Sequence, residues 1–141
     1  MKDHSQDTVG GQSLVEFALA IPILLLLMVV IFDLGRAVYY SSAVHNAARE
    51  GARYGIIHPD DDIGMVDAAE EYAIGLGLSD LTITAGLGPT EPVGGINNPT
   101  VQVTVIFSYI PATPLVEQFL PGGTISLTGD AIMRTEALPS P

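Results

Sequence analysis

The sequence predicts an α+β protein: a long N-terminal transmembrane and stalk helix, a second short helix, and a small three-stranded antiparallel sheet packed on the stalk. Three observations lead to this prediction. Residues 14–32 form an almost unbroken apolar run. Within residues 12–58 the only strong helix breaker is Pro22, which predicts one long helix with a kink or short unwinding at that proline. Apolar and polar residues alternate in 101–109 and again in 125–134, which is typical of strands with one buried face.

The apolar run has the length of a membrane span. At about 1.5 Å per residue it extends roughly 28 Å, close to the roughly 30 Å thickness of the bilayer core. We therefore expect residues 12–34 to form a transmembrane segment in contact with membrane lipid. Asp33 and Arg36 are expected to form an interfacial pair where the helix leaves the membrane. Glu16 interrupts the run, and an ionised carboxylate costs about 2.5 to 3.5 kcal/mol at the bilayer centre, less near its edge. Glu16 should therefore have a cationic partner.

Three interpretations of the N-terminal segment compete. A secretory signal peptide has a basic start and a short apolar core, but here Lys2 is outnumbered by acids and the run is longer than such a core. A permanent single-pass anchor fits the length. A prepilin-type segment has a short hydrophilic leader that ends in glycine, with glutamate as the fifth residue after cleavage. Cleavage between Gly11 and Gln12 would make Glu16 the fifth residue, with 1–11 as the leader.

Four blocks of sequence resemble one known family. These are GQSLVEFALAIPILLLL at 11–27, DLGRAVYY at 33–40, NAAREGARYG at 46–55 and AIMRTE at 131–136. In this order they resemble the TadE-like pseudopilins of tight-adherence pilus systems. A glycine followed five residues later by glutamate is a weak signal alone, but together with the arginine-containing run at 46–55 it is fairly specific.

The resemblance implies a bacterial inner-membrane protein with a role in building or tipping a pilus. Its function would be that of a pilin-like structural subunit or minor pilin of a type IV, tight-adherence pilus, inserted in the membrane before assembly. The implied partners are a prepilin peptidase and other pilin or pseudopilin subunits, with homo-oligomerisation left open. In pilins of this class the fifth-residue glutamate meets the freed amino terminus of a neighbour, which here is the amine of Gln12. The alternative is an unprocessed, membrane-anchored binding or assembly factor with an acidic extracytoplasmic head.

Two arguments about topology disagree. The positive-inside rule counts basic residues near each membrane end, and Arg36, Arg49 and Arg53 after the span outnumber Lys2 before it. This count alone favours a cytoplasmic head. The resemblance instead implies a cytoplasmic N-terminus and an extracytoplasmic head, which enters an extracellular pilus if the subunit is assembled. The composition of the head suits export, so we follow the resemblance.

Residues 35–58 are expected to form a stalk helix with a face of small side chains. Ala43, Ala47, Gly51 and Gly55 recur every four residues and therefore share one face. Small side chains let another backbone approach closely. Two interpretations are about equally favoured: this face receives the protein's own sheet, or it packs against another subunit.

Residues 59–141 are expected to form one small head domain. A second amphipathic helix should end near residues 75–77, and its apolar face is predicted to comprise Ile63, Val66, Ala69, Ala73 and Leu76. Residues 81–85 predict a short strand, 86–99 an exposed loop, and 111–123 a proline-bearing connection between the two longer strands.

Composition excludes several kinds of function. Cysteine is absent, so no disulfide or thiolate metal site stabilises the head. The head has eleven acidic residues and only Arg134 as a base, so its net charge is near minus ten and nucleic acid should be repelled. No nucleophile motif or phosphate-binding loop is present, so we expect neither an enzyme nor a cofactor. The acidic turn at 60–62 is interpreted as a helix cap, with a bound cation as the less favoured alternative.

The stalk arginines have two alternative partners. Arg49 and Arg53 share a helix face, and Glu50 lies three residues before Arg53, so a local ion pair is the favoured interpretation. The alternative is a pair with Asp130 or Glu136 of the sheet, which would fix the register between stalk and sheet.

Overall fold

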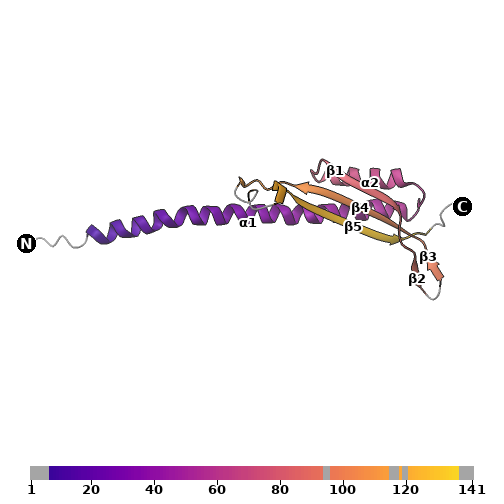
Figure 1. Cartoon of the computed structure of the whole chain (residues 1–141), viewed down its shortest axis with the longest axis horizontal. Helices are drawn as coiled ribbons and strands as arrows, with labels where there is room; N and C mark the ends of the chain where they lie inside the picture. The colour runs from indigo at the N-terminus through magenta and orange to yellow at the C-terminus, as the bar shows by residue number, and fades with distance from the viewer. Residues whose placement is uncertain (1–6, 94–95, 115–117, 119–120, 137–141) are drawn as a thin grey trace, which may run out of the picture.

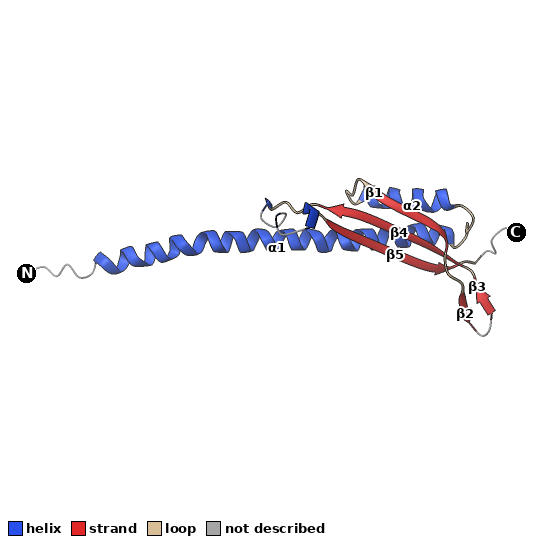
Figure 2. Cartoon of the chain, in the orientation of Figure 1, coloured by secondary structure: helices blue, strands red, loops and turns tan. Residues whose placement is uncertain are grey.

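The computed structural model describes residues 7–93, 96–114, 118 and 121–136. Its helices and strands form one long helix with a head packed along the half of it farther from the N-terminus (Figure 1, Figure 2). The elements in chain order are α1 (Asp7–Gly55), α2 (Asp62–Gly75), β1 (Leu81–Leu87), β2 (Glu91–Val93), β3 (Ile96–Asn98), β4 (Thr100–Tyr109), the 3-10 turn η1 (Pro121–Gly123) and β5 (Ile125–Arg134). The predicted α+β class is confirmed.

Helix α1 is a single helix of 49 residues, about 74 Å long at 1.5 Å per residue. It begins at Asp7, five residues before the expected start, and ends at Gly55, three residues before the expected end at His58. The chain leaves it through a turn in which the backbone N–H of His58 donates to Tyr54 O at 3.3 Å. Of the kink or short unwinding expected at Pro22, the unwinding is contradicted: α1 continues through this residue, and the helix curves gently in Figure 1. One missing hydrogen bond does not break a helix whose neighbouring turns remain bonded.

The sheet has the strand order β1-β4-β5, and both pairings are antiparallel. In its register Val105 lies opposite Ile83 on one side and Gly129 on the other. One face of the sheet packs on α1 and α2. The other face carries mostly threonine, serine and glutamine side chains open to solvent, which explains why alternation in the sequence revealed these strands.

The core lies between the sheet and the head-bound half of α1. Val101, Val103 and Val105 of β4 are fully buried against it. The buried core residues on α1 are small or β-branched: Ala43, Val44, Ala47, Ala48 and Ala52. This packing lets the helix approach the sheet closely, and it supplies the cover that the apolar face of β4 requires.

Helix α2 starts at an acidic cap. Asp61 accepts a hydrogen bond of 2.9 Å from the backbone N–H of Gly64 and another of 2.8 Å from the Tyr54 hydroxyl. The helix buries Met65, Ala69 and Ala73. Ala69 and Ala73 therefore lie in the core as predicted, but Ile63 is 75% exposed, and Met65 is buried instead.

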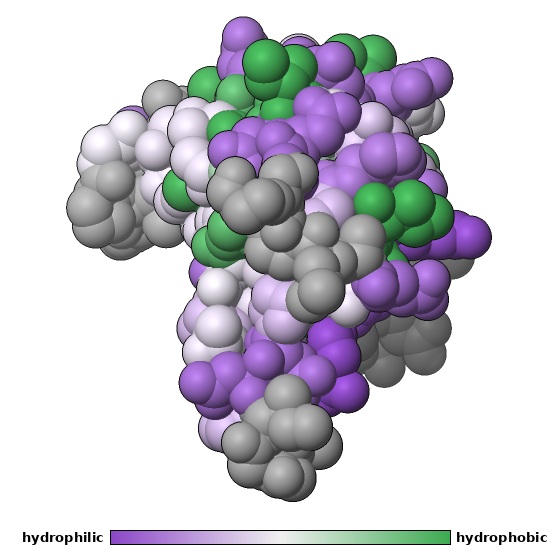
Figure 3. All heavy atoms as spheres, turned by 90° about the vertical axis from the view of Figure 1, so that its right-hand side faces the viewer, coloured by the Kyte–Doolittle hydropathy of each residue, from purple (hydrophilic) through white to green (hydrophobic). Residues whose placement is uncertain are grey.

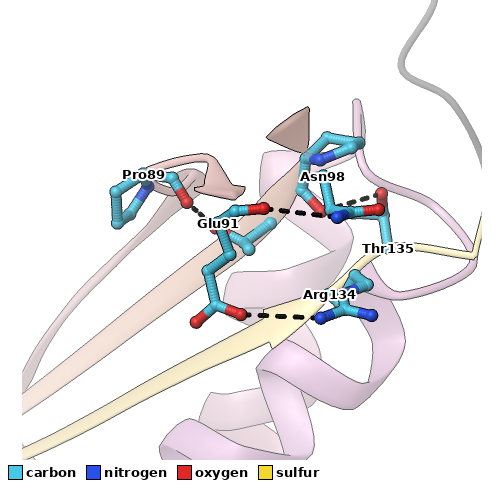
Figure 4. A network of polar contacts seen from close by, with 7 residues as sticks. Pro89, Glu91, Asn98, Arg134 and Thr135 are labelled. Atoms are coloured by element: carbon cyan, nitrogen blue, oxygen red, sulfur yellow. Dashed lines mark hydrogen bonds and ion pairs between the residues drawn. The ribbon is translucent and has the colours of Figure 1, made fainter. Parts of the chain in front are cut away.

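The segment expected to be one loop contains a hairpin. Strand β1 extends to Leu87, and β2 pairs with β3 in an antiparallel ribbon. Figure 4 shows one contact that ties this ribbon to the sheet: Arg134 of β5 lies 3.8 Å from a Glu91 carboxylate oxygen. Within the ribbon, the Asn98 amide donates to Glu91 O at 3.3 Å. The Thr100 hydroxyl also donates to Pro89 O at 2.6 Å. Three-residue strands are too short to show a pattern in the sequence.

Candidate functional site

The half of α1 that precedes the head is an apolar surface that no other described residue covers. It is long and apolar enough to cross a membrane, and none of its most hydrophobic window is buried. Its large side chains are exposed from Leu14 to Phe32, with Leu14 at 70% and Phe32 at 66%. An apolar surface of this length in contact with water would be strongly unfavourable, which suits an apolar environment such as a membrane.

Glu16 lies one turn after Gln12 near the start of this surface. The Gln12 amide donates a hydrogen bond of 3.3 Å to Glu16 Oε1, and both side chains are exposed. Gly11 lies within α1, and a Cβ at this position would meet nothing within 4 Å. This amide is a neutral partner and does not compensate a negative charge on Glu16.

Asp33 joins the apolar segment to the head. Its side chain is only 6% exposed, and its two carboxylate oxygens accept hydrogen bonds of 3.0 Å from the backbone N–H groups of Ala112 and Thr113. The hydroxyls of Thr113 and Tyr109 donate to the same carboxylate. We call this arrangement the Asp33 clasp. It fixes the end of β4 and the start of the β4–β5 connection against α1, one residue after the apolar run ends.

The expected pair between Asp33 and Arg36 was wrong. The Arg36 guanidinium lies over the rings of Tyr40 and Tyr109, with centroids 5.8 and 5.9 Å away. A hydrogen bond with Tyr40, followed by the nearby charges of Tyr40, Tyr109 and Asp33, raises the pKa of Arg36 above its ordinary value. The Asp33 carboxylate oxygens are instead occupied by the backbone N–H groups of Ala112 and Thr113.

A small apolar pocket lies beside the clasp. Its volume is about 120 Å³. The residues that line it come from α1, the end of β4 and the start of β5: Val30, Asp33, Leu34, Ala37, Tyr109, Pro111 and Ile125. It therefore sits at the level where the apolar helix meets the head.

Comparison with known families bears on this same helix. Residues 11–53 match the family model described as TadE-like protein. This segment is TadE-like. It suggests a pilus-associated protein of tight-adherence systems, and the apolar helix fits a single-pass membrane anchor. No curated protein and no solved structure matches the chain.

The TadE-like segment includes most of the small-residue face, and the structure shows what fills it. Ala43 and Ala47 are buried in the head core. A Cβ on Gly51 would lie 2.6 Å from the backbone oxygen of Met65, and one on Gly55 would collide with the Met65 side chain. The partner of this face is therefore the protein's own α2 and sheet, the first of the two interpretations considered.

The charged residues of the TadE-like segment form local contacts. Arg53 and Glu50 are 3.9 Å apart on the exposed side of α1, which confirms the local pair. Arg49 donates to Asn46 at 3.5 Å. On the sheet, Asp130 instead accepts hydrogen bonds of 2.9 and 2.7 Å from Gln102 and Thr104. The register between stalk and sheet is set by packing and by the Asp33 clasp.

The acidic turn before α2 acts as a helix cap through Asp61, as expected. Among the residues that the structure describes, no group of three histidine, aspartate or glutamate side chains is placed to hold a metal ion. The Asp33 clasp is the feature of this region that the sequence did not reveal, since its backbone and hydroxyl donors lie about 80 positions later in the chain.

Proposed function

We propose that this protein is a pilin-like structural subunit or minor pilin of a tight-adherence pilus system, inserted in the bacterial inner membrane before assembly. Its N-terminus is cytoplasmic and its head extracytoplasmic. The observation that carries the proposal is the uncovered apolar half of α1, continuous with the helix on which the head is built. A signal sequence would be a separable extension, whereas here one helix serves both the membrane segment and the core.

Such a helix suits two successive environments. In the membrane, lipid covers the exposed side chains between Leu14 and Phe32. In an assembled filament, the corresponding helices of other subunits would cover the same surface, so transfer from one to the other needs no refolding of the head. The head core is complete within one chain, which makes the subunit stable in both states.

Glu16 would favour the assembled state over the membrane-inserted monomer. Removal of the leader between Gly11 and Gln12 by a prepilin peptidase would create a new α-amine at Gln12, four residues before Glu16. In the intact chain the Gln12 amide at 3.3 Å is a neutral partner. A charged amine from a neighbouring subunit would be a stronger one, because an ion pair in a medium of low dielectric offsets the burial of each charge. Assembly would then give the Glu16 carboxylate a cationic partner, the Gln12 amine of a neighbouring subunit.

One alternative has a specific observation in its favour. Helix α1 runs without interruption from Asp7 across the bond between Gly11 and Gln12, so a peptidase must locally unwind it. An unprocessed chain would be a membrane-anchored binding or assembly factor whose acidic head binds a cationic partner.

The mass of the intact protein from its native cell separates the two. Processing predicts a mature chain that starts at Gln12, and replacement of Gly11 by a bulky residue should leave the leader attached. The same bulky replacement at Ala18, another small residue of α1, is the control and should not prevent removal of the leader. If the mature wild-type protein retains residues 1–11, the pilin proposal fails and the anchored binding factor is the better account.

A further inference from the structure

The end of the head that contains the Asp33 clasp has a fixed height along α1. Asp33 follows Phe32, the last residue of the apolar run, and its carboxylate binds the backbone of Ala112 and Thr113. If the apolar run occupies the bilayer core, the segment around residues 109–114 is therefore held at the level of the lipid headgroups. This step rests on the membrane insertion proposed above.

The side chains at this level are of the kinds that lipid interfaces favour. Ile110 projects from the clasped segment and is 61% exposed, although its neighbours Tyr109 and Pro111 are buried. On α1, Leu34 is 65% exposed and Tyr39 is 52% exposed. Arg36 lies over two tyrosine rings. Apolar tips, tyrosines and an arginine are enriched where one end of a side chain meets hydrocarbon and the other meets water.

The opposite end of the head differs. Figure 3 views the molecule from the end farthest from the apolar helix, and hydrophilic side chains occupy much of that face. Ile57 lies at this end, just after α1, and is 62% exposed. The helix between Asp33 and Gly55 rises roughly 33 Å at 1.5 Å per residue, so Ile57 stands well clear of the headgroup layer.

We propose that the clasped end of the head is seated in the bilayer interface, with Ile110, Leu34 and Tyr39 in contact with phospholipid. The apolar pocket of about 120 Å³ between α1, Tyr109 and Pro111 opens at the same height and receives part of a lipid acyl chain. The occupant is phospholipid because Leu34 and Ile110 directly adjoin the exposed apolar run that ends at Phe32. This contact with the interface, which we call the seat, fixes the orientation of the head and the depth of the subunit in the bilayer before assembly.

The chain contains no tryptophan, so a single introduced tryptophan reports its own environment. We would place the full chain in phosphatidylcholine vesicles containing lipids brominated near the carbonyl end of the acyl chain, and compare Ile110→Trp with Ile57→Trp. The two isoleucines are almost equally exposed, at 61% and 62%, so they form a matched pair. Leu25→Trp, in the middle of the apolar run, reports insertion itself.

The proposal predicts blue-shifted emission from Ile110→Trp, quenched several-fold more by bromolipid than that of Ile57→Trp and less accessible to aqueous iodide. If Leu25→Trp is shielded from iodide while Ile110→Trp behaves like Ile57→Trp, the helix is inserted but the seat is wrong. If Leu25→Trp is itself open to iodide, membrane insertion fails, and both the seat and the proposed function fall with it. Unchanged thermal midpoints of the variants show that the head remains folded.

Discussion

The backbone N–H of Thr113 donates a hydrogen bond of 3.0 Å to Asp33 Oδ2 across 80 positions of sequence. With the parallel bond from Ala112, it fastens the β4–β5 connection to α1 at the point where the apolar segment ends. The apolar segment and the head are therefore joined in two ways, by the continuous helix α1 and by these hydrogen bonds.

Replacement of Asp33 by asparagine should destabilise the head. The amide group has one oxygen where the carboxylate has two, so one of the backbone donors is left without an acceptor. An unsatisfied buried donor costs about 1 to 3 kcal/mol, and more when a charged acceptor is lost. The thermal midpoint of the detergent-solubilised chain should fall, while Asp67→Asn on the exposed side of α2 should leave it almost unchanged. Equal midpoints for the two variants would refute the clasp.

Two glycines of α1 should respond in opposite ways to alanine. A Cβ on Gly51 would lie 2.6 Å from Met65 O, so Gly51→Ala must push α2 away, and overpacking of this kind costs about 1 to 3 kcal/mol. A Cβ on Gly35 would meet nothing within 4 Å, so Gly35→Ala should gain up to about 1 kcal/mol of helix propensity. Denaturant unfolding measures both. A Gly51→Ala chain as stable as the wild type would contradict the intramolecular packing of the small-residue face.

The head should require the second half of α1 for folding. A chain shortened to start at Pro59 would expose Val101, Val103 and Val105, and each large side chain contributes roughly 1.5 to 3 kcal/mol when buried. It should aggregate or remain unfolded. A chain that starts at Asp33 keeps both the cover and the clasp and should unfold cooperatively. Circular dichroism and gel filtration distinguish these outcomes, and a cooperatively folded Pro59 chain of equal stability would overturn this view of the core.

Stability should depend on pH through Asp61. The hydrogen bonds from Gly64 N–H and the Tyr54 hydroxyl hold the pKa of Asp61 below its usual range. Asp61 therefore stabilises the folded head at pH values above the ordinary carboxyl pKa, and this contribution is lost as the pH falls through the lowered value in the folded state. The stability difference between wild type and Asp61→Asn should shrink as pH decreases. A difference that stays constant down to strongly acidic pH would show that the carboxylate charge is not involved.

The parts of the fold that were predictable from sequence are those with long, regular patterns. Alternation identified β4 and β5 because the sheet has one buried and one solvated face, and the length of the apolar run identified the membrane half of α1. The β2–β3 ribbon was missed because each of its strands has three residues. On α2, both Ile63 and Met65 are apolar, and only the tertiary contact with α1 decides which of them is buried.

The candidate site was predictable to a similar extent. The positions of Gly11, Gln12 and Glu16 follow directly from spacing, so the sequence alone could raise the prepilin hypothesis. The clasp could not be found in this way, because its donors are two backbone N–H groups and two neutral hydroxyls far along the chain, and none of them is a charged residue at a telling spacing. The sequence pattern, an acid at the end of an apolar run with an arginine nearby, predicted an ion pair between Asp33 and Arg36. In the structure Arg36 lies over the rings of Tyr40 and Tyr109 instead.

The central claim is that Glu16 pairs with the amine of Gln12 on a neighbouring subunit, and co-purification of Glu16→Ala protein with the assembled pilus or pilus-assembly complex tests it most directly. Loss of one partner of a buried ion pair costs about 3 to 5 kcal/mol, or roughly a hundredfold to a few thousandfold in a subunit equilibrium. We expect the variant to be cleaved and membrane-anchored but absent from the assembly, whereas Glu50→Ala, which alters a partly exposed acid on the same helix, should be incorporated normally. Incorporation of Glu16→Ala at the wild-type level would contradict the account.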